Sequence, residues 1–329
     1  MKSALRLIFA ACLVFLAASS LPAANKTPSE NAYVSVTNIA SSVGMSVKKS
    51  EADGHVRYTL SSKWSTVELE EGSPVCRVND VQLHLSAAPV SRGTLLYMMR
   101  SDYKKTIEPL LLPQKFAPAP DLKTIVIDPG HGGRDDGAQN KAAGIKEKVM
   151  TLDLATRLKT QLEERGYRVL VTRTKDEFIE LPDRPAYAAK VKADLFISLH
   201  FNASTDTSVF GAETYILPPA GRPASSNSTY DQSPVAGNRF DEWNVIAAYY
   251  VQRELVNTLG AADRGVRRAR FAVLRPLSCP GMLVESGYVS NRTECAKIAQ
   301  SAYRDKIATA IANAVDAYSR TVRRVQSAQ

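Results

Sequence analysis

The sequence predicts an α/β protein in which a mostly parallel sheet is sandwiched by helices and is preceded by a small α+β domain. Two observations carry this expectation. Short strand-like segments and helical segments fill residues 32–112, whereas apolar strand-like segments alternate with longer helices in residues 122–322. The second pattern is typical of parallel strands joined by helical crossovers. Between them, residues 113–121 contain three prolines and predict an extended, semi-rigid linker.

The composition fits a folded protein with a substantial core. The chain has 329 residues, of which 44% are hydrophobic and 23% charged, so a disordered or fibrous protein is not expected. Four cysteines are present, Cys12, Cys76, Cys279 and Cys295, and their spacings match no structural zinc motif. A disulfide between Cys279 and Cys295 is the best candidate pairing in an exported protein, with free buried thiols as the equal alternative.

Residues 1–24 have the features of a secretory signal peptide, with Lys2 and Arg6 before an apolar stretch and small residues after it. Cleavage is expected between Ser20 and Ala24. An uncleaved membrane anchor is the alternative, but the apolar stretch is shorter than the ~20 residues of a membrane span. We therefore expect an exported protein, in the periplasm or outside the cell at the cell wall, with no stable membrane span after cleavage.

The chain is basic. Its formal net charge is +9 and falls to +7 when Lys2 and Arg6 leave with the signal peptide. Such a protein tends to stay on anionic surfaces such as cell-wall polymers. The basic residues are scattered rather than arranged in a stripe, and no nucleic-acid-binding module is recognisable, so no nucleic-acid partner is expected.

The small domain is expected to begin with a helix. Apolar residues recur with helical spacing at positions 36, 39, 40 and 43, and Gly44 ends the pattern. Strand-like segments follow as VRYTL, STVELE, VCRV and VQLHL, and Asn79-Asp80 is a candidate hairpin turn between the last two. A second helical segment is expected to begin near Ser101 and to end before Pro109.

In the second domain, buried strands are expected at TIVID, YRVLVT, DLFISL, AETYIL, FAVL and GMLVE. Helices are expected at residues 147–165, 182–190, 241–259 and 303–320. The inward side of the first helix is expected to carry Leu152, Ala155, Leu158 and Leu162. Residues 218–240 are rich in Pro, Gly, Ser and Asn, which predicts an insertion loop.

Four polar residues fall at the ends of these elements. His131 follows the strand TIVID by two residues, His200 directly follows DLFISL, Glu285 ends GMLVE, and Glu147 opens a helix. Ligands of open α/β sheets collect beyond the carboxyl ends of the strands, so these side chains can converge there. Two imidazoles and a carboxylate are a common ligand set for hydrolytic zinc, and a further carboxylate can move the proton of the attacking water.

Each residue taken alone has a simpler explanation. His131 can be a solvated residue of a tight turn, Glu147 a favourable acid in the first turn of a helix, and His200 a core histidine bonded to backbone. Glu285 is harder to explain in this way, because a carboxylate at the end of an apolar strand needs a partner. The four residues together favour a metal site.

The segments around these residues, TIVIDPGHGG, AAGIKEKVM, DLFISLHFNAS and GMLVESGYVSN, resemble the zinc-dependent N-acetylmuramoyl-L-alanine amidases of type 3, over residues 124–318. The resemblance implies one zinc ion held by His131, Glu147 and His200, with Glu285 as general base and acid. It also implies the substrate. This is peptidoglycan, cut at the amide between the lactyl group of N-acetylmuramic acid and L-alanine of the stem peptide.

The resemblance also suggests residues that bind the substrate. Asn202 is expected to support the loop after the strand DLFISL, and Arg267, Arg268 and Arg270 to meet substrate carboxylates. Turn formation and simple solvation are the alternatives. Some relatives carry a helix near residues 218–240 that blocks the zinc until an activator releases it. This insertion has few helix formers and many helix breakers, so a flexible loop that shapes the substrate site is expected instead.

The segments YVSVTNIASSVGMSV and VNDVQLHLSAAPVSRGTLLYMMRSDYKKTIEPLL resemble the small repeat domain first described at the N-terminus of copper amine oxidases. This resemblance implies a domain that binds the cell wall or a partner such as an activator protein, through residues 32–112. It implies no copper, because His55 and His84 stand alone without further ligands.

Two other functions remain open from the sequence. One is a zinc peptidase acting on a different amide, although the chain lacks the HExxH motif. The other is a catalytically inactive wall-binding or activator protein, which the presence of all four site residues disfavours.

Overall fold

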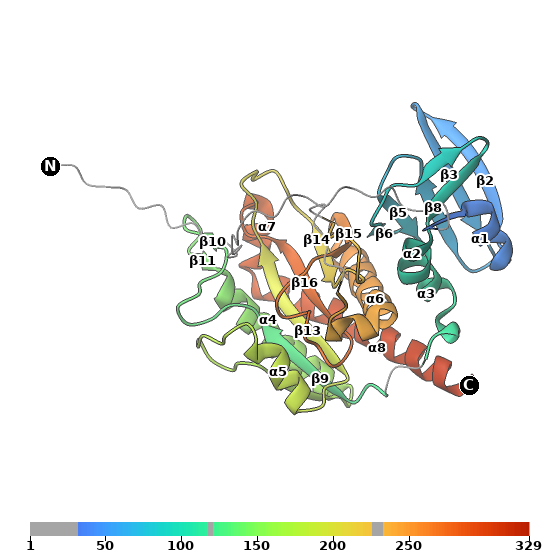
Figure 1. The fold of residues 1–329 in the computed structure, drawn as a ribbon. Helices are drawn as coiled ribbons and strands as arrows, with labels where there is room; N and C mark the ends of the chain where they lie inside the picture. Colours follow the sequence, from blue (N-terminus) through green and yellow to red (C-terminus); the bar gives the residue numbers. More distant parts are fainter. Residues whose placement is uncertain (1–31, 118–120, 226–232, 329) are drawn as a thin grey trace, which may run out of the picture.

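The computed structural model describes residues 32–117, 121–225 and 233–328, which form a small N-terminal domain and a larger C-terminal domain (Figure 1). The predicted signal peptide lies outside the described residues, as do parts of the predicted linker and of the insertion. Among the described residues, no helix is long and apolar enough to cross a membrane.

The small domain packs helices against an antiparallel sheet. The short helix α1 (Val36–Ser42) begins after Ser35, whose side chain accepts a hydrogen bond from the Asn38 amide. Five consecutive strands then form a meander, β2 (Ser46–Ala52), β3 (His55–Ser61), β4 (Thr66–Glu70), β5 (Val75–Val78) and β6 (Val81–His84). A separate sheet contains β1 (Tyr33–Ser35), β8 (Leu95–Met99) and β7 (Val90–Arg92). Asn79 and Asp80 both have positive φ, as the tight turn between β5 and β6 requires.

The second helical segment of the small domain is longer than predicted. It runs through α2 (Arg100–Asp102), a π-helical stretch (Tyr103–Ile107) and α3 (Glu108–Leu111), so it passes Pro109 instead of ending before it. Pro109 is the second residue of α3, directly after the π-helical stretch, where the helical hydrogen-bond pattern changes. The segment predicted as an extended linker begins with a short 3-10 helix (Pro113–Lys115).

The C-terminal domain is built on a mostly parallel sheet, which confirms the predicted fold class. The strand order is β12 (Arg168–Val171), β9 (Thr124–Pro129), β13 (Leu195–Asn202), β16 (Gly281–Tyr288), β14 (Ala212–Ile216) and β15 (Asp263–Arg268). The first four strands are parallel, β14 runs antiparallel to β16, and β15 is parallel to β14. A two-stranded hairpin, β10 (Gln139–Asn140) and β11 (Ile145–Lys146), lies outside this sheet.

Helices cover both faces of the sheet. The helices α4 (Glu147–Glu164), α6 (Asp241–Leu259) and α8 (Ser301–Ser327) pack on one face, and α5 (Asp183–Lys190) lies on the other (Figure 1). A short helix, α7 (Arg292–Ile298), leads from β16 to α8. The buried stripe of α4 contains Leu154, Ala155, Leu158 and Leu162. The prediction that Leu152 faces inward is wrong, because this residue lies about a quarter turn from the stripe and is only partly buried.

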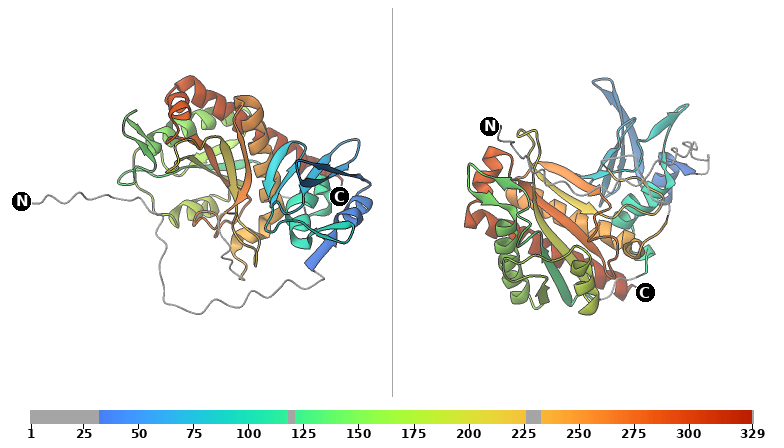
Figure 2. Two further views of the ribbon diagram at one scale, coloured as in Figure 1. Left: turned by 90° about the horizontal axis from the view of Figure 1, so that it is seen from above. Right: turned by 60° about the vertical axis from the view of Figure 1, so that its left-hand side comes forward.

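The two domains share one sheet. Strand β6 of the small domain pairs in parallel with β15, with Leu83 opposite Val266, so that eleven strands are continuous. At this seam Asp263 accepts a hydrogen bond from the Gln82 amide (2.8 Å). Figure 2 shows the small domain beside α6. The apolar residues of both domains form one buried cluster, so the domains are packed together at this seam.

One predicted strand is wrong. Residues 271–274, FAVL, form a turn, whereas the polar segment Asp263–Arg268 is the strand β15. The apolar side chains of the turn are buried without sheet pairing, because Val273 and Leu274 pack beside Leu283 in a second apolar cluster. Hydrophobicity therefore marked a buried segment here but not its backbone conformation.

The candidate disulfide between Cys279 and Cys295 is not formed, and the structure agrees with the alternative of free buried thiols. Cys76, Cys279 and Cys295 are all free and buried. Cys279 lies in the second apolar cluster and Cys295 in the main one, on opposite faces of the sheet, so the sheet separates the two sulfurs. Burial raises the pKa of Cys279 to about 12, and this thiol stays protonated.

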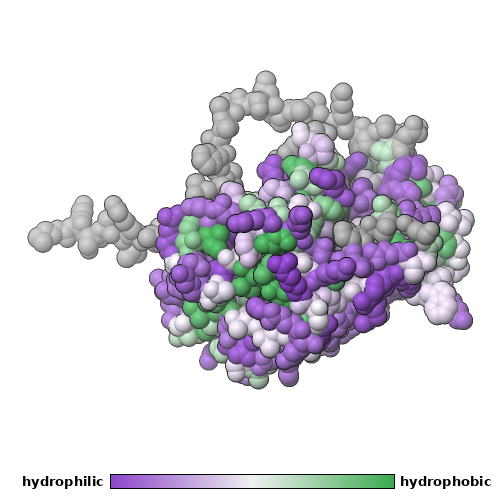
Figure 3. Space-filling view, turned by 90° about the horizontal axis from the view of Figure 1, so that it is seen from below, coloured by the Kyte–Doolittle hydropathy of each residue, from purple (hydrophilic) through white to green (hydrophobic). Residues whose placement is uncertain are grey.

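The surface has both polar and apolar regions. Figure 3 shows one face on which apolar residues gather near the middle and hydrophilic residues surround them. Large apolar side chains that are more than half exposed include Leu181 and Phe210 in the C-terminal domain. A surface of this kind is compatible with binding a ligand that is only partly polar.

Candidate active site

Three residues from separate elements converge near the carboxyl ends of the parallel strands. His131 lies in the loop after β9, Glu147 is the first residue of α4, and His200 lies in β13. Their candidate ligand atoms all lie within 4.8 Å of one another. In the described part of the chain this is the one such group of three or more histidine, cysteine or acidic side chains, and we call it the ligand cluster.

Glu147 is the centre of the ligand cluster and is only 3% exposed. Its Oε1 lies 2.8 Å from Nδ1 of His200 and accepts a hydrogen bond from the Phe201 amide. Its Oε2 lies 3.1 Å from Nε2 of His131 and accepts a hydrogen bond from the Ala138 amide. Burial opposes the charged form, but the two histidines outweigh burial and lower the pKa of Glu147. The carboxylate is therefore ionised, as a metal ligand must be.

His131 is held in an uncommon backbone conformation, with a φ of 63°. Its carbonyl accepts a hydrogen bond from Arg184 (2.9 Å), and its Nδ1 lies 2.8 Å from Oδ2 of Asp135. Burial works to lower the pKa of the imidazole, but Glu147 and Asp135 outweigh it and raise the pKa to about 9. A carboxylate behind a histidine in this way fixes the orientation of the ring and strengthens its basicity toward a metal.

Two buried arginines support the loop that carries His131. Arg173, which is 2% exposed, donates hydrogen bonds to the backbone carbonyls of Pro129, Gly130 and Lys148. Arg184 forms a buried ion pair with Asp128 (2.8 Å). Because most of these bonds go to backbone oxygens of the loop and of the first turn of α4, they fix the position of one segment relative to the other.

The ligand cluster fits zinc. Two imidazoles and one carboxylate form a common ligand set of hydrolytic zinc sites, in which a fourth position is kept for water. Ligand atoms of a tetrahedral zinc site lie about 3.4 Å apart when each bond is about 2.1 Å long. The three side chains already come within 4.8 Å of one another, so small shifts suffice. Gly137 lets the backbone approach them, because a Cβ there would lie 2.6 Å from Oε2 of Glu147.

Glu285 lies on the strand next to His200. The two residues are in register in the parallel pair of β13 and β16, so their side chains point to the same face of the sheet. On the other side of Glu285, β14 places Glu213 in register with it. Glu285 is 9% exposed. The structure therefore brings Glu285 beside the ligand cluster.

Two of the residues predicted to bind substrate contact Glu213, the strand neighbour of Glu285. Asn202 ends β13 and donates a hydrogen bond from Nδ2 to Glu213 (2.7 Å). The guanidinium of Arg267 lies 3.1 Å from the same carboxylate. Both side chains therefore contact Glu213, which lies in register with Glu285.

The other two lie in different surroundings. Arg268 is buried at the domain seam, where it donates hydrogen bonds to the Lys105 carbonyl and to the Thr106 hydroxyl of the small domain. Arg270 donates a hydrogen bond to the carbonyl of Arg222 in the insertion. The four residues thus lie in three places: Asn202 and Arg267 contact Glu213, Arg268 lies at the domain seam, and Arg270 contacts the insertion.

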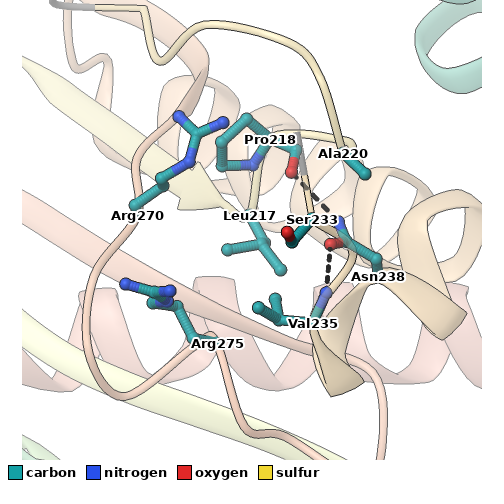
Figure 4. A pocket seen from close by; sticks show the side chains of 8 residues that line it. All are labelled: Leu217, Pro218, Ala220, Ser233, Val235, Asn238, Arg270 and Arg275. Carbon is teal, nitrogen blue, oxygen red and sulfur yellow. Dashed lines mark hydrogen bonds between the residues drawn. The ribbon is translucent and has the colours of Figure 1, made fainter. Parts of the chain in front are cut away.

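The described ends of the insertion fold against each other. The side chain of Asn238 joins them, because it donates to the Pro218 carbonyl and accepts from the Val235 amide, both at 3.0 Å (Figure 4). Arg270 and Arg275 border the same small hollow from the loop after β15 (Figure 4). The described residues of the insertion contain a short 3-10 helix (Ala236–Phe240) and no α-helix.

Three of the supporting residues are ones that the sequence patterns did not single out, namely Asp135, Arg173 and Glu213. Asp135 lies four residues after His131, and this spacing within one glycine-rich loop was a usable signal. Arg173 follows the end of β12, the same kind of position that pointed to the other site residues. Glu213 offered no signal beyond a carboxylate within an apolar strand.

Comparison with known proteins agrees with this geometry. The family model described as N-acetylmuramoyl-L-alanine amidase matches residues 125–317. The chain belongs to this family. We therefore call the C-terminal domain the amidase domain.

Named amidases are among the relatives of the chain. LytC of Bacillus subtilis is 36% identical over 198 residues, which cover 60% of this chain and 36% of LytC. AmiA of Escherichia coli K12 is 32% identical over 220 residues, which cover 60% of this chain and 76% of AmiA. The match therefore spans well under two thirds of the length of LytC.

Solved amidase structures match as well. The N-acetylmuramoyl-L-alanine amidase from Clostridium difficile 630 has a TM-score of 0.52 and 31% identity, and the match covers 60% of this chain and 97% of that one. The CwlD amidase from Clostridioides difficile, in complex with the GerS lipoprotein, has a TM-score of 0.51 and 27% identity, with 60% and 98% covered.

Proposed function

We propose that the protein is a zinc-dependent N-acetylmuramoyl-L-alanine amidase. It would hydrolyse the amide between the lactyl group of N-acetylmuramic acid and L-alanine of the stem peptide in peptidoglycan. The observation that carries the proposal is the ligand cluster beside Glu285 in a chain of this family. The same geometry could serve another amide, so the substrate class rests on the family.

His131, Glu147 and His200 are proposed to hold one zinc ion. Zinc in such a site activates a water molecule near neutral pH and polarises the carbonyl under attack. The chain keeps the carboxylate of Glu147 ionised and orients the imidazole of His131 through Asp135. Arg173 and Arg184 hold the loop of His131 against α4.

Glu285 is proposed to take a proton from the attacking water and to pass it to the nitrogen of the leaving L-alanine. Its position beside His200 on the same face of the sheet supports this role. Arg267 and Asn202 are proposed to act near the substrate, whereas Arg268 is expected to hold the two domains together.

We further propose that the protein is exported and acts at the cell wall, with the small domain holding it near the wall or near an activator protein. The basic charge and the predicted signal peptide support export to an anionic surface. The matched CwlD structure, in complex with the GerS lipoprotein, supports a protein partner for the chain but does not indicate which domain would bind it. A folded chain that begins at residue 121 and binds insoluble wall as tightly as the full chain would contradict this role of the small domain.

The first experiment is digestion of purified peptidoglycan, read by mass spectrometry, with and without a chelator and added zinc. We expect free stem peptides with an N-terminal L-alanine, which disappear with the chelator and return with zinc. As a control, another member of the family must cleave the same substrate. If it does and the zinc-loaded protein does not, the proposed activity is contradicted.

The second experiment is Glu285→Ala. Removing a general acid–base group lowers the rate about 10²–10⁴-fold, and zinc should stay bound, because the ligand cluster is intact. The exposed Glu164, at the end of α4, provides the control Glu164→Ala, which should keep full activity. An active, zinc-loaded Glu285→Ala protein would remove Glu285 from this role.

A further inference from the structure

Glu213 is a buried carboxylate to which the proposed mechanism gives no role. It is the second residue of β14, is 1% exposed, and lies in register with Glu285 on β16. A buried charge needs partners, and Glu213 has them on both oxygens. Its Oε1 accepts hydrogen bonds from Nδ2 of Asn202 and from the hydroxyl of Tyr288, both at 2.7 Å. Its Oε2 lies 3.1 Å from Nη1 of Arg267.

Two of these partners end the strands that carry the site. Asn202 follows His200 by two residues in β13, and Tyr288 follows Glu285 by three residues in β16. The strand pairing is irregular between His200 and Asn202, after which Asn202 lies opposite Tyr288. The regular ladder is therefore interrupted directly beside the site, where it cannot by itself fix the strand ends. Glu213 bonds both residues just beyond this irregular step.

The other side of Glu213 is anchored on β15. Besides Arg267, the guanidinium of Arg264 lies 3.5 Å from the carboxylate and 5.2 Å from the ring centre of Tyr288. The Arg264 carbonyl lies 3.2 Å from Nε2 of His84 in β6, so the small domain also contacts β15. Burial, followed by the hydrogen bond to Glu213, raises the pKa of Tyr288. The hydroxyl therefore stays protonated and can donate to the carboxylate.

We infer that Glu213 is a positioning residue for Glu285. Its charge joins Asn202 and Tyr288 to the arginines of β15, and this sets the position of Glu285 relative to His200. Glu213 acts through these neighbours and not on the substrate. The inference rests on the proposed function and adds a residue to it.

The test is Glu213→Gln in the full chain, which keeps the size of the side chain and removes its charge. An amide has one oxygen, so it can accept hydrogen bonds on one side only, and its NH2 group then faces a donor on the other. We expect kcat on a soluble muropeptide to fall about 10- to 100-fold, the range for outer partners of catalytic metal sites. KM, and zinc affinity from competition with a chelator, should change less than about threefold, because the ligand cluster is not touched.

Tyr288→Phe provides a second variant. It removes only the hydroxyl that donates to Glu213, so it tests the inference even where Glu213→Gln does not fold, and kcat should again fall with KM unchanged. In the double variant the loss should be smaller than the product of the single losses, because both changes act on one network. Independent, multiplying losses would overturn the inference.

Asp102→Asn is the matched control. Asp102 is another buried carboxylate, 3% exposed, and accepts hydrogen bonds from Ser86 in the small domain. This variant should lose stability and keep kcat. A folded Glu213→Gln protein with kcat within about twofold of wild type would overturn the inference. So would a loss of zinc affinity as large as the loss of kcat. A wild-type protein that releases no stem peptide would instead contradict the proposed function, and the inference with it.

Discussion

A Cβ added to Gly130 would lie 2.2 Å from Cε1 and 2.4 Å from Nε2 of His200. The backbone after β9 therefore packs directly on the face of this imidazole, and only glycine permits so close an approach. The Gly130 carbonyl also accepts a hydrogen bond from the hydroxyl of Thr151 in α4 (2.9 Å). The loop and the helix that carry the other two members of the ligand cluster thus limit where the ring of His200 can lie.

The first prediction concerns Gly130→Ala. The added methyl group must displace the ring of His200 or the loop, so zinc affinity should fall about 10- to 100-fold, as when the support of a metal ligand is lost. Competition with a fluorescent chelator measures this. Gly144→Ala is the control. A Cβ added there meets nothing within 4 Å, so this variant introduces backbone strain at a φ of 65° without any contact to the ligand cluster. Wild-type zinc affinity in Gly130→Ala would show that the ring does not depend on this contact.

The ligand cluster could be anticipated from the sequence for a physical reason. His131, Glu147 and His200 each lie at or near the end of a strongly patterned strand or the start of a helix. Parallel strands place their carboxyl ends along one edge of a sheet, so local patterns were enough to bring these residues together. The position of a residue can therefore be predicted from the sequence when the residue lies at the end of a strand or the start of a helix that the local pattern marks clearly.

Contacts between elements could not be anticipated in the same way. Whether Glu213 meets Arg267 depends on the strand order of β14 and β15, which no local pattern specifies. The strand β15 itself was missed because most of its side chains are polar, so no apolar pattern marks it, although its backbone pairs with β14 and β6. Likewise, the pairing of Leu83 with Val266 joins two sheet edges and leaves no periodic signal.

The second prediction concerns Arg173→Lys. A lysine ammonium cannot donate hydrogen bonds to all of the carbonyls that the planar guanidinium of Arg173 bonds. At least one buried acceptor then loses a charged donor, so the free energy of unfolding should fall by about 2–4 kcal/mol. Urea denaturation measures this. Arg168→Lys, at an exposed position of β12, is the control and should change stability by less than about 0.5 kcal/mol. Equal losses in the two variants would contradict a special role of Arg173.

The third prediction concerns the domain seam. Gly265 in β15 has a φ of 88°, and a Cβ there would lie 2.8 Å from the Gln82 carbonyl of β6. Gly265→Ala should therefore separate the two strands, and amide hydrogen exchange in β5 and β6 should become faster. Gly93→Ala, also at positive φ but with nothing within 4 Å, is the control for backbone strain alone. Unchanged exchange in β6 of the Gly265 variant would show that the seam tolerates a side chain.

The fourth prediction concerns the pH dependence of stability. Asp153 in α4 lies between Arg157 of the same helix and Arg304 of α8. Burial works to raise the pKa of Asp153, but the two arginines outweigh it and hold the pKa below the usual 3.8. A group with a lowered pKa stabilises the fold above its ordinary pKa, and this contribution is lost as the pH falls through the folded value.

Wild type should therefore exceed Asp153→Asn in free energy of unfolding by a constant amount above about pH 5, and the difference should shrink below about pH 4. Urea denaturation at a series of pH values measures this difference. The exposed carboxylate of Asp121 provides the surface control, Asp121→Asn. A difference between wild type and Asp153→Asn that persists unchanged to about pH 2 would show that the charge of Asp153 does not hold α4 to α8.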